Sequence, residues 1–222
     1  MNRLLMVIAL ATVASGCALL NPDTPDAIPT DGLSAEQRQA ELLRITDWRL
    51  QGRIALRSGE EGANASLVWT QQGDDTEVRL FGAFGLGAVR LVQGQQDAAL
   101  YRSGHKPLYG ENAEQLLRWE TGMRIPLKSL GYWVRGLPGN GEDLSYDSYG
   151  RLRSLQYVDD FGAQWAATFE RYREVNGHQL PVRVRVEGSD YLIRLTVERW
   201  TTEAADSAPA DTQRLRIPGV SS

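Results

Sequence analysis

The chain has 222 residues and a formal net charge of −4, from 24 lysines and arginines against 28 aspartates and glutamates. This length allows one domain with a substantial core, and the acidic balance argues against nucleic acid and predicts no basic patch for anionic lipid. One cysteine and two histidines allow no intrachain disulfide and supply few ligands for a histidine-based metal or acid–base site.

The first segment predicts a secretion signal that ends at the only cysteine, Cys17. Arg3 precedes the apolar run Leu4–Val13, and small residues follow, in the order typical of a signal peptide over residues 1–16. The run is too short for a membrane-spanning helix, which needs about 20 apolar residues. Residues 14–17, Ala-Ser-Gly-Cys, resemble the bacterial lipobox, which implies a lipid on Cys17. The alternative is an ordinary secretory signal with a cysteine there by chance.

Residues 17–33 are expected to form a lipidated cysteine and a flexible tether. The segment 18–33 holds three prolines and three aspartates and shows no periodic apolar pattern. Ala18 follows the cysteine where the enterobacterial sorting rule has Asp for inner-membrane retention, and by that resemblance the outer membrane is expected. At the other end, residues 201–222 are small and polar, and we expect a disordered tail.

The folded domain is predicted over residues 34–200, beginning with a helix. Ser34-Ala35-Glu36-Gln37 is a capping-box pattern, so the helix should run to about Ile45 with Leu42, Leu43 and Ile45 buried. From Trp48 the apolar period changes to two, which predicts strands. The strands expected in this half are 48–57, 63–71, 77–81, 88–93, 98–102 and 106–110.

Two helices and four more strands complete the predicted domain. Asn112 caps a helix that Gly122 ends, and Pro126 opens a second helix with an apolar stripe through Leu130 and Trp133. The strands expected after it are 152–157, 164–172, 181–187 and 191–200. Short connections favour antiparallel pairing, so the expected fold is α+β, mainly β, with a long antiparallel sheet curled around a few helices.

Motifs for catalysis are absent from the sequence. No G-x-S-x-G elbow, P-loop, G-x-G-x-x-G or H-E-x-x-H occurs. The carboxylate pair Asp159-Asp160 is expected at a solvated hairpin tip, and His105 and His178 beside surface turns. The sequence therefore predicts no enzyme, no catalytic residue and no metal site.

An apolar turn is the first feature that suggests a function. Residues 81–87, Phe-Gly-Ala-Phe-Gly-Leu-Gly, are uncharged at a predicted strand-to-strand turn, where polar residues are usual. One interpretation is an exposed apolar finger that touches lipid or a partner, and the other is a hairpin folded back on the core. The six tryptophans leave a similar choice between ordinary core and the lining of a cavity wide enough for acyl chains.

Several motifs, taken together, resemble the LolB family of outer-membrane lipoproteins over about residues 40–200. The most specific are the strand segment with Trp69 and Gln71 and the segment Trp133–Gly139. In chain order the motifs are Trp48-x-x-x-Gly52-Arg53, Leu67-Val68-Trp69-Thr70-Gln71-Gln72, Gly85-Leu86-Gly87, Ile125-Pro126-Leu127 with Leu130, and Tyr132-Trp133-Val134-Arg135-Gly136-Leu137-Pro138-Gly139.

The resemblance implies an unclosed antiparallel β-barrel, or half-barrel, with helices across its apolar opening. It also implies an apolar loop whose protruding leucine places cargo in the membrane. Aligned on the glycine that follows, that leucine falls at Phe84 in this chain, and another register puts Leu86 at the tip.

The function implied by the resemblance is acceptance of acylated lipoproteins from the periplasmic carrier LolA and their insertion into the inner leaflet of the outer membrane. No nucleotide and no cofactor are expected beyond the lipid on Cys17, and the protein should act as a monomer. The residues expected to line the acyl-chain cavity are Leu67, Trp69, Leu91, Trp133 and Trp165.

Other functions stay open at this point. A lipid-anchored structural or adaptor protein of the envelope would have a solidly packed interior and dock its apolar turn on a protein. A lipoprotein-sensing protein could use a similar half-barrel, and a hydrolase is the most distant alternative.

Overall fold

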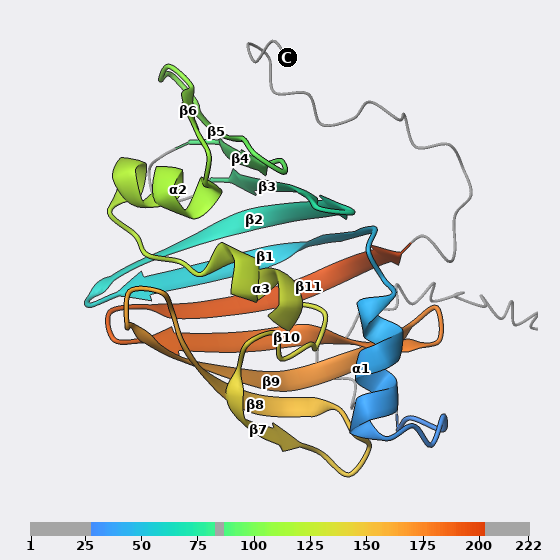
Figure 1. Ribbon diagram of the computed structural model, residues 1–222. Helices are drawn as coiled ribbons and strands as arrows, with labels where there is room; N and C mark the ends of the chain where they lie inside the picture. The colour runs from blue at the N-terminus through green and yellow to red at the C-terminus, as the bar shows by residue number, and fades with distance from the viewer. Residues whose placement is uncertain (1–27, 83–86, 203–222) are drawn as a thin grey trace, which may run out of the picture.

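The computed structural model describes residues 28–82 and 87–202, which form one open antiparallel sheet with three helices (Figure 1). The predicted fold class, an unclosed antiparallel β-barrel with helices over its interior, is confirmed. In chain order the elements are α1 (Ala35–Leu43), β1 (Trp48–Ser58), β2 (Glu61–Gln72), β3 (Asp75–Phe81), β4 (Val89–Gln93), β5 (Ala98–Arg102), β6 (Leu108–Gly110), α2 (Ala113–Thr121), α3 (Leu127–Trp133), β7 (Glu142–Tyr146), β8 (Leu152–Val158), β9 (Gln164–Val175), β10 (His178–Gly188) and β11 (Leu192–Thr202).

The sheet consists of two meanders that are joined by the first and the last strand. Its order is β6-β5-β4-β3-β2-β1-β11-β10-β9-β8-β7, and neighbouring strands are antiparallel. Of these pairs, only β1–β11 joins strands far apart in the sequence, and it places Leu50 opposite Trp200. The edge strands β6 and β7 do not pair with each other, so the barrel stays open.

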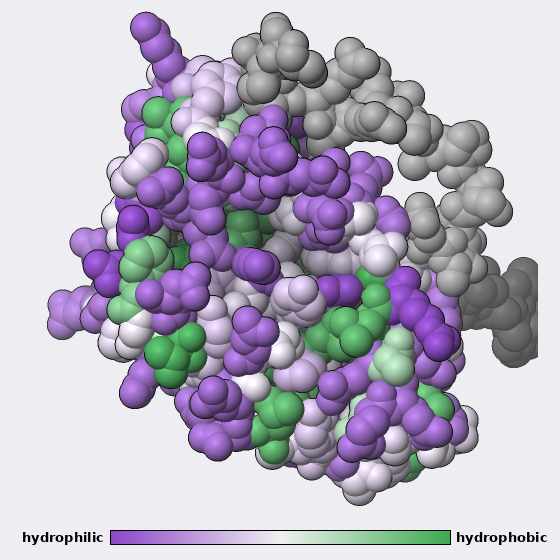
Figure 2. Space-filling view, in the orientation of Figure 1, coloured by the Kyte–Doolittle hydropathy of each residue, from purple (hydrophilic) through white to green (hydrophobic). Residues whose placement is uncertain are grey.

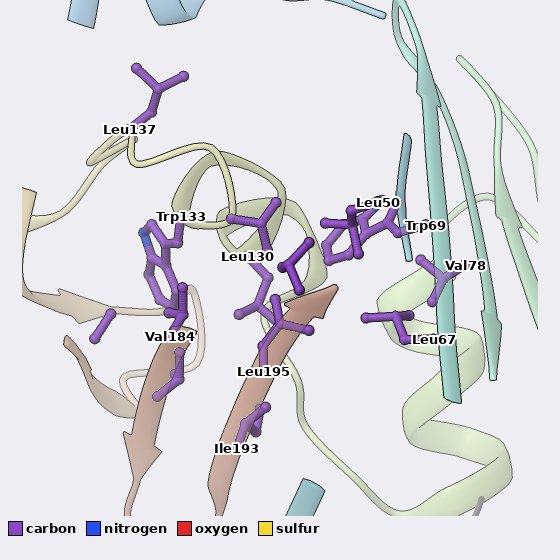
Figure 3. Close-up of a cluster of buried hydrophobic side chains, with 14 of the residues drawn as sticks. Leu50, Leu67, Trp69, Val78, Leu130, Trp133, Leu137, Val184, Ile193 and Leu195 are labelled. Atoms are coloured by element: carbon purple, nitrogen blue, oxygen red, sulfur yellow. The ribbon is translucent and has the colours of Figure 1, made fainter. Parts of the chain in front are cut away.

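Alternation with period two gives the sheet an apolar concave face. In β1, Trp48, Leu50 and Leu56 are buried, whereas the arginines between them are exposed. The helices cover this face, with α3 across the middle of the sheet and α2 against β4, β5 and β6 (Figure 1). Leu130 and Trp133 of α3 lie among the buried side chains of the strands (Figure 3).

The turns gather at the two ends of the sheet. One end, called the hairpin rim below, carries the β1–β2, β3–β4, β5–β6, β8–β9 and β10–β11 turns. The opposite end holds the start of β1, the end of β11 and the β7–β8 turn, and α1 lies beside it (Figure 1). Gly150 of the β7–β8 turn is so close to α1 that a Cβ there would lie 2.8 Å from the amide nitrogen of Ala35. The chain therefore enters the domain at the end opposite the hairpin rim.

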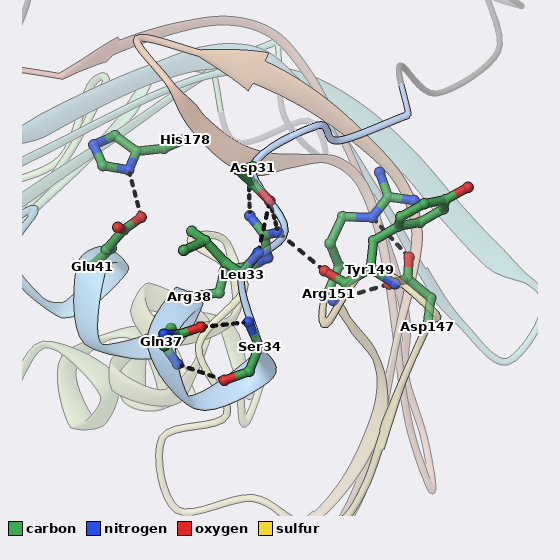
Figure 4. A network of polar contacts seen from close by, with 10 residues as sticks. All are labelled: Asp31, Leu33, Ser34, Gln37, Arg38, Glu41, Asp147, Tyr149, Arg151 and His178. Atoms are coloured by element: carbon green, nitrogen blue, oxygen red, sulfur yellow. Dashed lines mark hydrogen bonds and ion pairs between the residues drawn. The ribbon is translucent and has the colours of Figure 1, made fainter.

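A buried arginine fixes this entry. Arg38 is only 4 % exposed, forms a salt bridge of 2.9 Å with Asp31, and donates a hydrogen bond of 3.0 Å to the carbonyl of Tyr149 (Figure 4). The hydrogen bonds from Arg38 lower the pKa of Asp31 below its usual value. Asp31, which the sequence assigns to the tether, is thus bonded to the domain.

The structure differs from the local expectations in three places. Strand β7 was not predicted, because Glu142–Tyr146 is a short, exposed edge strand without apolar alternation. The prediction that Leu43 is buried was wrong: it is 54 % exposed, because a residue next to buried Leu42 lies about 100° around the helix. Trp119 of α2 is 64 % exposed, whereas the other tryptophans are buried.

Gly52 marks a bulge where β1 pairs with β11, and it gives the first testable prediction. The β1–β11 register shifts between Gln51 and Gly52, and a Cβ on Gly52 would lie 2.1 Å from the carbonyl oxygen of Thr196. Because backbone must move to admit that atom, Gly52→Ala should lower the free energy of unfolding by about 3 kcal/mol in urea titrations.

Gly62 of β2 provides the matched control. A Cβ there would meet its nearest atom only at 3.8 Å, so Gly62→Ala should change the free energy of unfolding by less than about 1 kcal/mol. Equal effects of the two substitutions would contradict the importance of the close β1–β11 approach.

Candidate functional site

A pocket with polar and apolar side chains in its wall lies at the hairpin rim. It has a volume of about 670 Å³ and lies where the β1–β2 hairpin meets the end of α2 and the β10–β11 turn. Its lining residues are Leu56, Ser58, Glu61, Gly62, Ala63, Glu120, Thr121, Gly122, Met123 and Tyr191. Seen from the side of the helices, the surface is hollowed, and hydrophobic residues lie in the depth between polar ones (Figure 2). This volume is within the range of ligand-binding pockets.

The wall of this pocket continues into the buried core through Tyr191. The ring of Tyr191 stacks on Trp165 with centroids 6.4 Å apart and an angle of 8° between the planes. Trp165 in turn is 2 % exposed and lies so close to Gly188 that a Cβ on this glycine would be 2.8 Å from the indole. Tyr191 therefore joins the wall of the pocket to the buried Trp165.

The five predicted cavity residues all lie in the buried cluster on the concave face. They come from β2, β4, α3 and β9, and Figure 3 shows Leu67, Trp69 and Trp133 within this cluster. None of the five lines the pocket at the hairpin rim. In this structure the five side chains pack within the buried cluster, and their contact with an acyl chain stays a prediction.

Two of the buried tryptophans keep polar atoms without partners. The indole nitrogens of Trp48 and Trp69 have no hydrogen-bond acceptor among the described residues, although the two rings are only 5.6 Å apart. By contrast, the indole nitrogen of Trp133 donates to the carbonyl of Pro138 at 3.2 Å. Buried donors are usually satisfied, so this part of the interior can accept a carbonyl or water oxygen.

A second, smaller pocket lies where α2 meets the β8–β9 turn. It has a volume of about 250 Å³ and is lined by Asn112, Glu114, Gln115, Arg118, Arg124, Ile125, Pro126, Tyr157, Asp159, Asp160 and Phe161. The guanidinium of Arg118 lies 4.7 Å from the ring centre of Phe161, and the carboxylate of Glu114 accepts a hydrogen bond of 2.7 Å from the amide of Lys128. These contacts join α2 to the sheet and to α3.

Asp159 differs from the solvated residue that the sequence predicted. One carboxylate oxygen accepts hydrogen bonds from the amides of Phe161 and Ala163, and the other accepts from the indole nitrogen of Trp165 at 3.1 Å. Asp159 therefore holds the turn and positions a core tryptophan, whereas Asp160 is exposed as expected.

Three predicted site residues lie outside the described residues: Cys17, Phe84 and Leu86. The described flanks of the apolar loop show where it is attached. Phe81 ends β3 at the hairpin rim and is 46 % exposed. Gly82 and Gly87 both have left-handed backbone angles, with φ of 72° and 71°. The loop is thus attached at the same end of the sheet as the β1–β2 hairpin, after a strand whose last residue pairs with Ser66 of β2.

Sequence reasoning missed Met123 and Tyr191 as pocket residues. Both lie between or at the ends of elements, where no apolar period identifies a buried face. Over residues 28–82 and 87–202, no group of three His, Cys, Asp or Glu side chains is arranged to hold a metal ion. In the same part of the chain, no helix is long and apolar enough to cross a membrane.

Comparisons of the sequence with known proteins show one family. The family model "Outer membrane lipoprotein LolB" matches residues 46–200. An outer-membrane lipoprotein LolB of Stutzerimonas stutzeri is 31% identical over 198 residues, which cover 88% of this chain and 94% of the relative. One from Alkalilimnicola ehrlichii is 33% identical over 204 residues, which cover 90% of this chain and 97% of the relative.

One solved structure shares the fold at much lower identity. The crystal structure of a DUF1329 family protein from Desulfovibrio piger has a TM-score of 0.50 and 9% identity, and the match covers 78% of this chain and 92% of that one. This likeness concerns the fold alone.

The acidic group at the smaller pocket gives the second prediction. Burial raises the pKa of Glu114 above its ordinary value of 4.5, and the charges of Asp160 and Asp159 raise it further. The folded state therefore holds this proton more tightly than the unfolded state, and the stability so gained is complete below pH 4.5 and is lost as the pH rises through the raised pKa.

Glu114→Gln keeps an acceptor for the amide of Lys128 and removes the charge. We expect a higher urea midpoint than for the unmodified protein at neutral pH, and a difference that shrinks below pH 4.5. The neighbouring, exposed Gln115→Ala serves as the control and should show no such pH dependence. A difference that stays constant over this pH range would contradict a cost from the buried charge.

Proposed function

The chain belongs to the LolB family of outer-membrane lipoproteins, and from this membership we propose that it accepts acylated lipoproteins from the periplasmic carrier LolA and inserts them into the inner leaflet of the outer membrane. The structural observation that supports this best is the pocket of about 670 Å³ where the apolar concave face reaches the hairpin rim. An open sheet with such a face can receive acyl chains from the side of the helices.

The need for a receptor of this kind follows from the hydrophobic effect. Each methylene removed from water contributes about 0.8 kcal/mol, so a chain with about 14 buried methylenes costs on the order of 10 kcal/mol to expose. Acyl chains must therefore pass directly from one apolar interior to the next. In this chain they would enter beside Met123 and Tyr191 and displace the packing around Trp165 and Trp69.

Transfer of this kind needs no covalent chemistry by the protein. If affinity for the acyl chains rises from carrier to receptor to bilayer, each step runs downhill. The proposal therefore includes no catalytic residue and no cofactor other than the lipid on Cys17. The indole donors of Trp48 and Trp69 would have a role here, because the acyl esters of a lipoprotein bring carbonyl acceptors into the interior.

The final step requires contact with the membrane. The apolar loop with Phe84 and Leu86 is attached at the hairpin rim, where the larger pocket also opens. An apolar side chain at this place would enter the headgroup region while the acyl chains leave the pocket. The loop therefore serves delivery and not loading.

A two-step transfer assay tests the proposed function. The purified full chain is mixed with cargo-loaded LolA, and the acylated cargo is followed first onto the chain and then into liposomes. Transfer in both steps supports a lipoprotein receptor. Binding of cargo without delivery would favour a lipoprotein-sensing protein, and no transfer with active carrier would favour a structural adaptor.

The third prediction concerns the loop. Phe84→Glu should leave transfer from LolA intact and reduce delivery to liposomes at least about tenfold, because a charged side chain is costly to place in the apolar part of the bilayer. Phe84→Leu is the matched control and should retain delivery. Unchanged delivery by the glutamate variant would exclude Phe84 as the insertion residue, and Leu86→Glu would then test the other register.

The fourth prediction concerns the pocket. Ala63 lies on the inner face of β2 and lines the larger pocket, so Ala63→Trp should fill part of it and weaken binding of a fluorescent fatty acid about tenfold. Ser66 is exposed on the outer face of the same strand, and Ser66→Trp should leave binding unchanged. Equal binding by both variants would place the acyl chains elsewhere.

A further inference from the structure

Four neighbouring strands of this acidic protein are strongly basic. Strands β1, β11, β10 and β9 are adjacent in the sheet and contain nine arginines and four glutamates, with no lysine or aspartate. The whole chain, in contrast, has a net charge of −4. The arginines are Arg49, Arg53, Arg57, Arg171, Arg173, Arg183, Arg185, Arg194 and Arg199.

These arginines belong to the convex face of the sheet. The concave-face residues of the four strands are buried, and each of the nine arginines is exposed or half-buried. We call this surface the arginine face. The expectation that the chain has no basic patch was therefore wrong. The net charge is a sum over the whole chain, whereas the alternation of side chains along each strand places these arginines on one face.

The register brings like charges together on this face. Arg171 lies directly opposite Arg183 in the β9–β10 pair, and Arg185 lies directly opposite Arg194 in the β10–β11 pair. Like charges directly opposite each other destabilise a sheet. The register thus places two arginine pairs side by side on this face, and Glu187 offsets part of the repulsion at Arg185.

The glutamates neutralise only part of the arginine face. Glu198 forms an ion pair of 3.0 Å with Arg53, and Glu187 forms one of 2.7 Å with Arg185. Arg49, Arg183 and Arg194 have no described carboxylate within ion-pair distance, although the charge of Arg194 helps to lower the pKa of Glu187. These three guanidinium groups can therefore reach an external anionic group.

From these observations we infer that the arginine face binds the anionic phospholipid surface of the membrane. Neighbouring strands are about 4.8 Å apart, so the guanidinium groups form a broad two-dimensional array that suits a layer of phosphates better than a single anion. The four strands lie in the middle of the sheet, so they offer no free edge to a partner strand. A protein of an outer-membrane lipoprotein family also has such a surface within reach.

This contact would orient the half-barrel on the membrane. The convex face would lie on the bilayer, and the helices over the concave face would point toward the aqueous compartment. The orientation adds to the proposed function, because acyl chains would then arrive from the side away from the bilayer. The binding itself does not depend on that function and can be measured separately.

The experiment measures this orientation on the full chain reconstituted in vesicles. A fluorescent probe is attached at Thr196→Cys, on the arginine face, or at Gln115→Cys, on exposed α2, and the lipid headgroups carry a quencher. The unsubstituted chain corrects for any label on Cys17. Vesicles of phosphatidylcholine alone are compared with vesicles that also contain phosphatidylglycerol, at low and at high salt.

We expect stronger quenching at Thr196 than at Gln115, only with phosphatidylglycerol, and less of it at high salt. The variant R49Q/R183Q/R194Q should weaken the oriented state at least about tenfold, without loss of stability, because these residues make no ion pair. The matched control R44Q/K106Q/K128Q removes the same charge elsewhere and should keep the orientation.

Two results would overturn the inference. Equal quenching at the two positions, or quenching that the arginine substitutions leave unchanged, would show that the arginine face does not bind lipid. If the arginine variant instead lost cargo transfer from LolA while its quenching stayed normal, the face would bind the carrier protein. If quenching changed with lipid and salt as expected, but neither the unsubstituted chain nor any variant transferred cargo, the result would contradict the proposed function and leave the inference intact.

Discussion

The pairing of the first strand with the last is the constraint on which the rest of the structure depends. Without β1–β11, the chain would form two separate meanders, β1–β6 and β7–β11, with two more open edges. The pairing brings the ring centre of Trp48 within 5.5 Å of that of Trp200. Because the Trp48 ring also lies 5.6 Å from that of Trp69 in the neighbouring strand β2, one aromatic cluster spans both meanders. A single concave face results, and the close approach at Gly52 makes the joint possible.

The concave face of an open sheet must be covered by other elements of the chain. Here the cover consists of short helices: α2 has nine residues and α3 has seven. Helices of this length depend on packing for their stability, so they are the elements that can move at the smallest cost. Where α2 ends, the cover stops short of the β1–β2 hairpin, and the larger pocket opens there. The entry to the interior thus lies where the helices cover the concave face least.

The sequence predicted those parts of the fold that have a local cause. Apolar alternation identified most strands. Helix ends were predicted at Ser34 and Asn112, whose side chains accept hydrogen bonds from amides of the first turn, and at Gly122, whose left-handed backbone angles end the helix. Strand β7 and the pocket residues Met123 and Tyr191 carry no such pattern, because only distant contacts decide their position. The arginine face was missed for a related reason, since strand order and register decide which charges become neighbours.

The two ends of the sheet set a geometric condition on any membrane contact. The described chain begins near the β7–β8 turn, where Arg38 holds Asp31, whereas the apolar loop leaves the opposite end, the hairpin rim. An 11-residue strand such as β1 is about 37 Å long, and the 11 residue-to-residue steps from Cys17 to Ile28 cover at most about 36–40 Å. If the barrel stood upright on its rim, a lipid on Cys17 would need nearly the full reach of this segment to enter the same bilayer. A barrel that lies along the membrane on its arginine face brings both ends close to the lipid, so the proposed anchor, loop and basic face favour the same orientation.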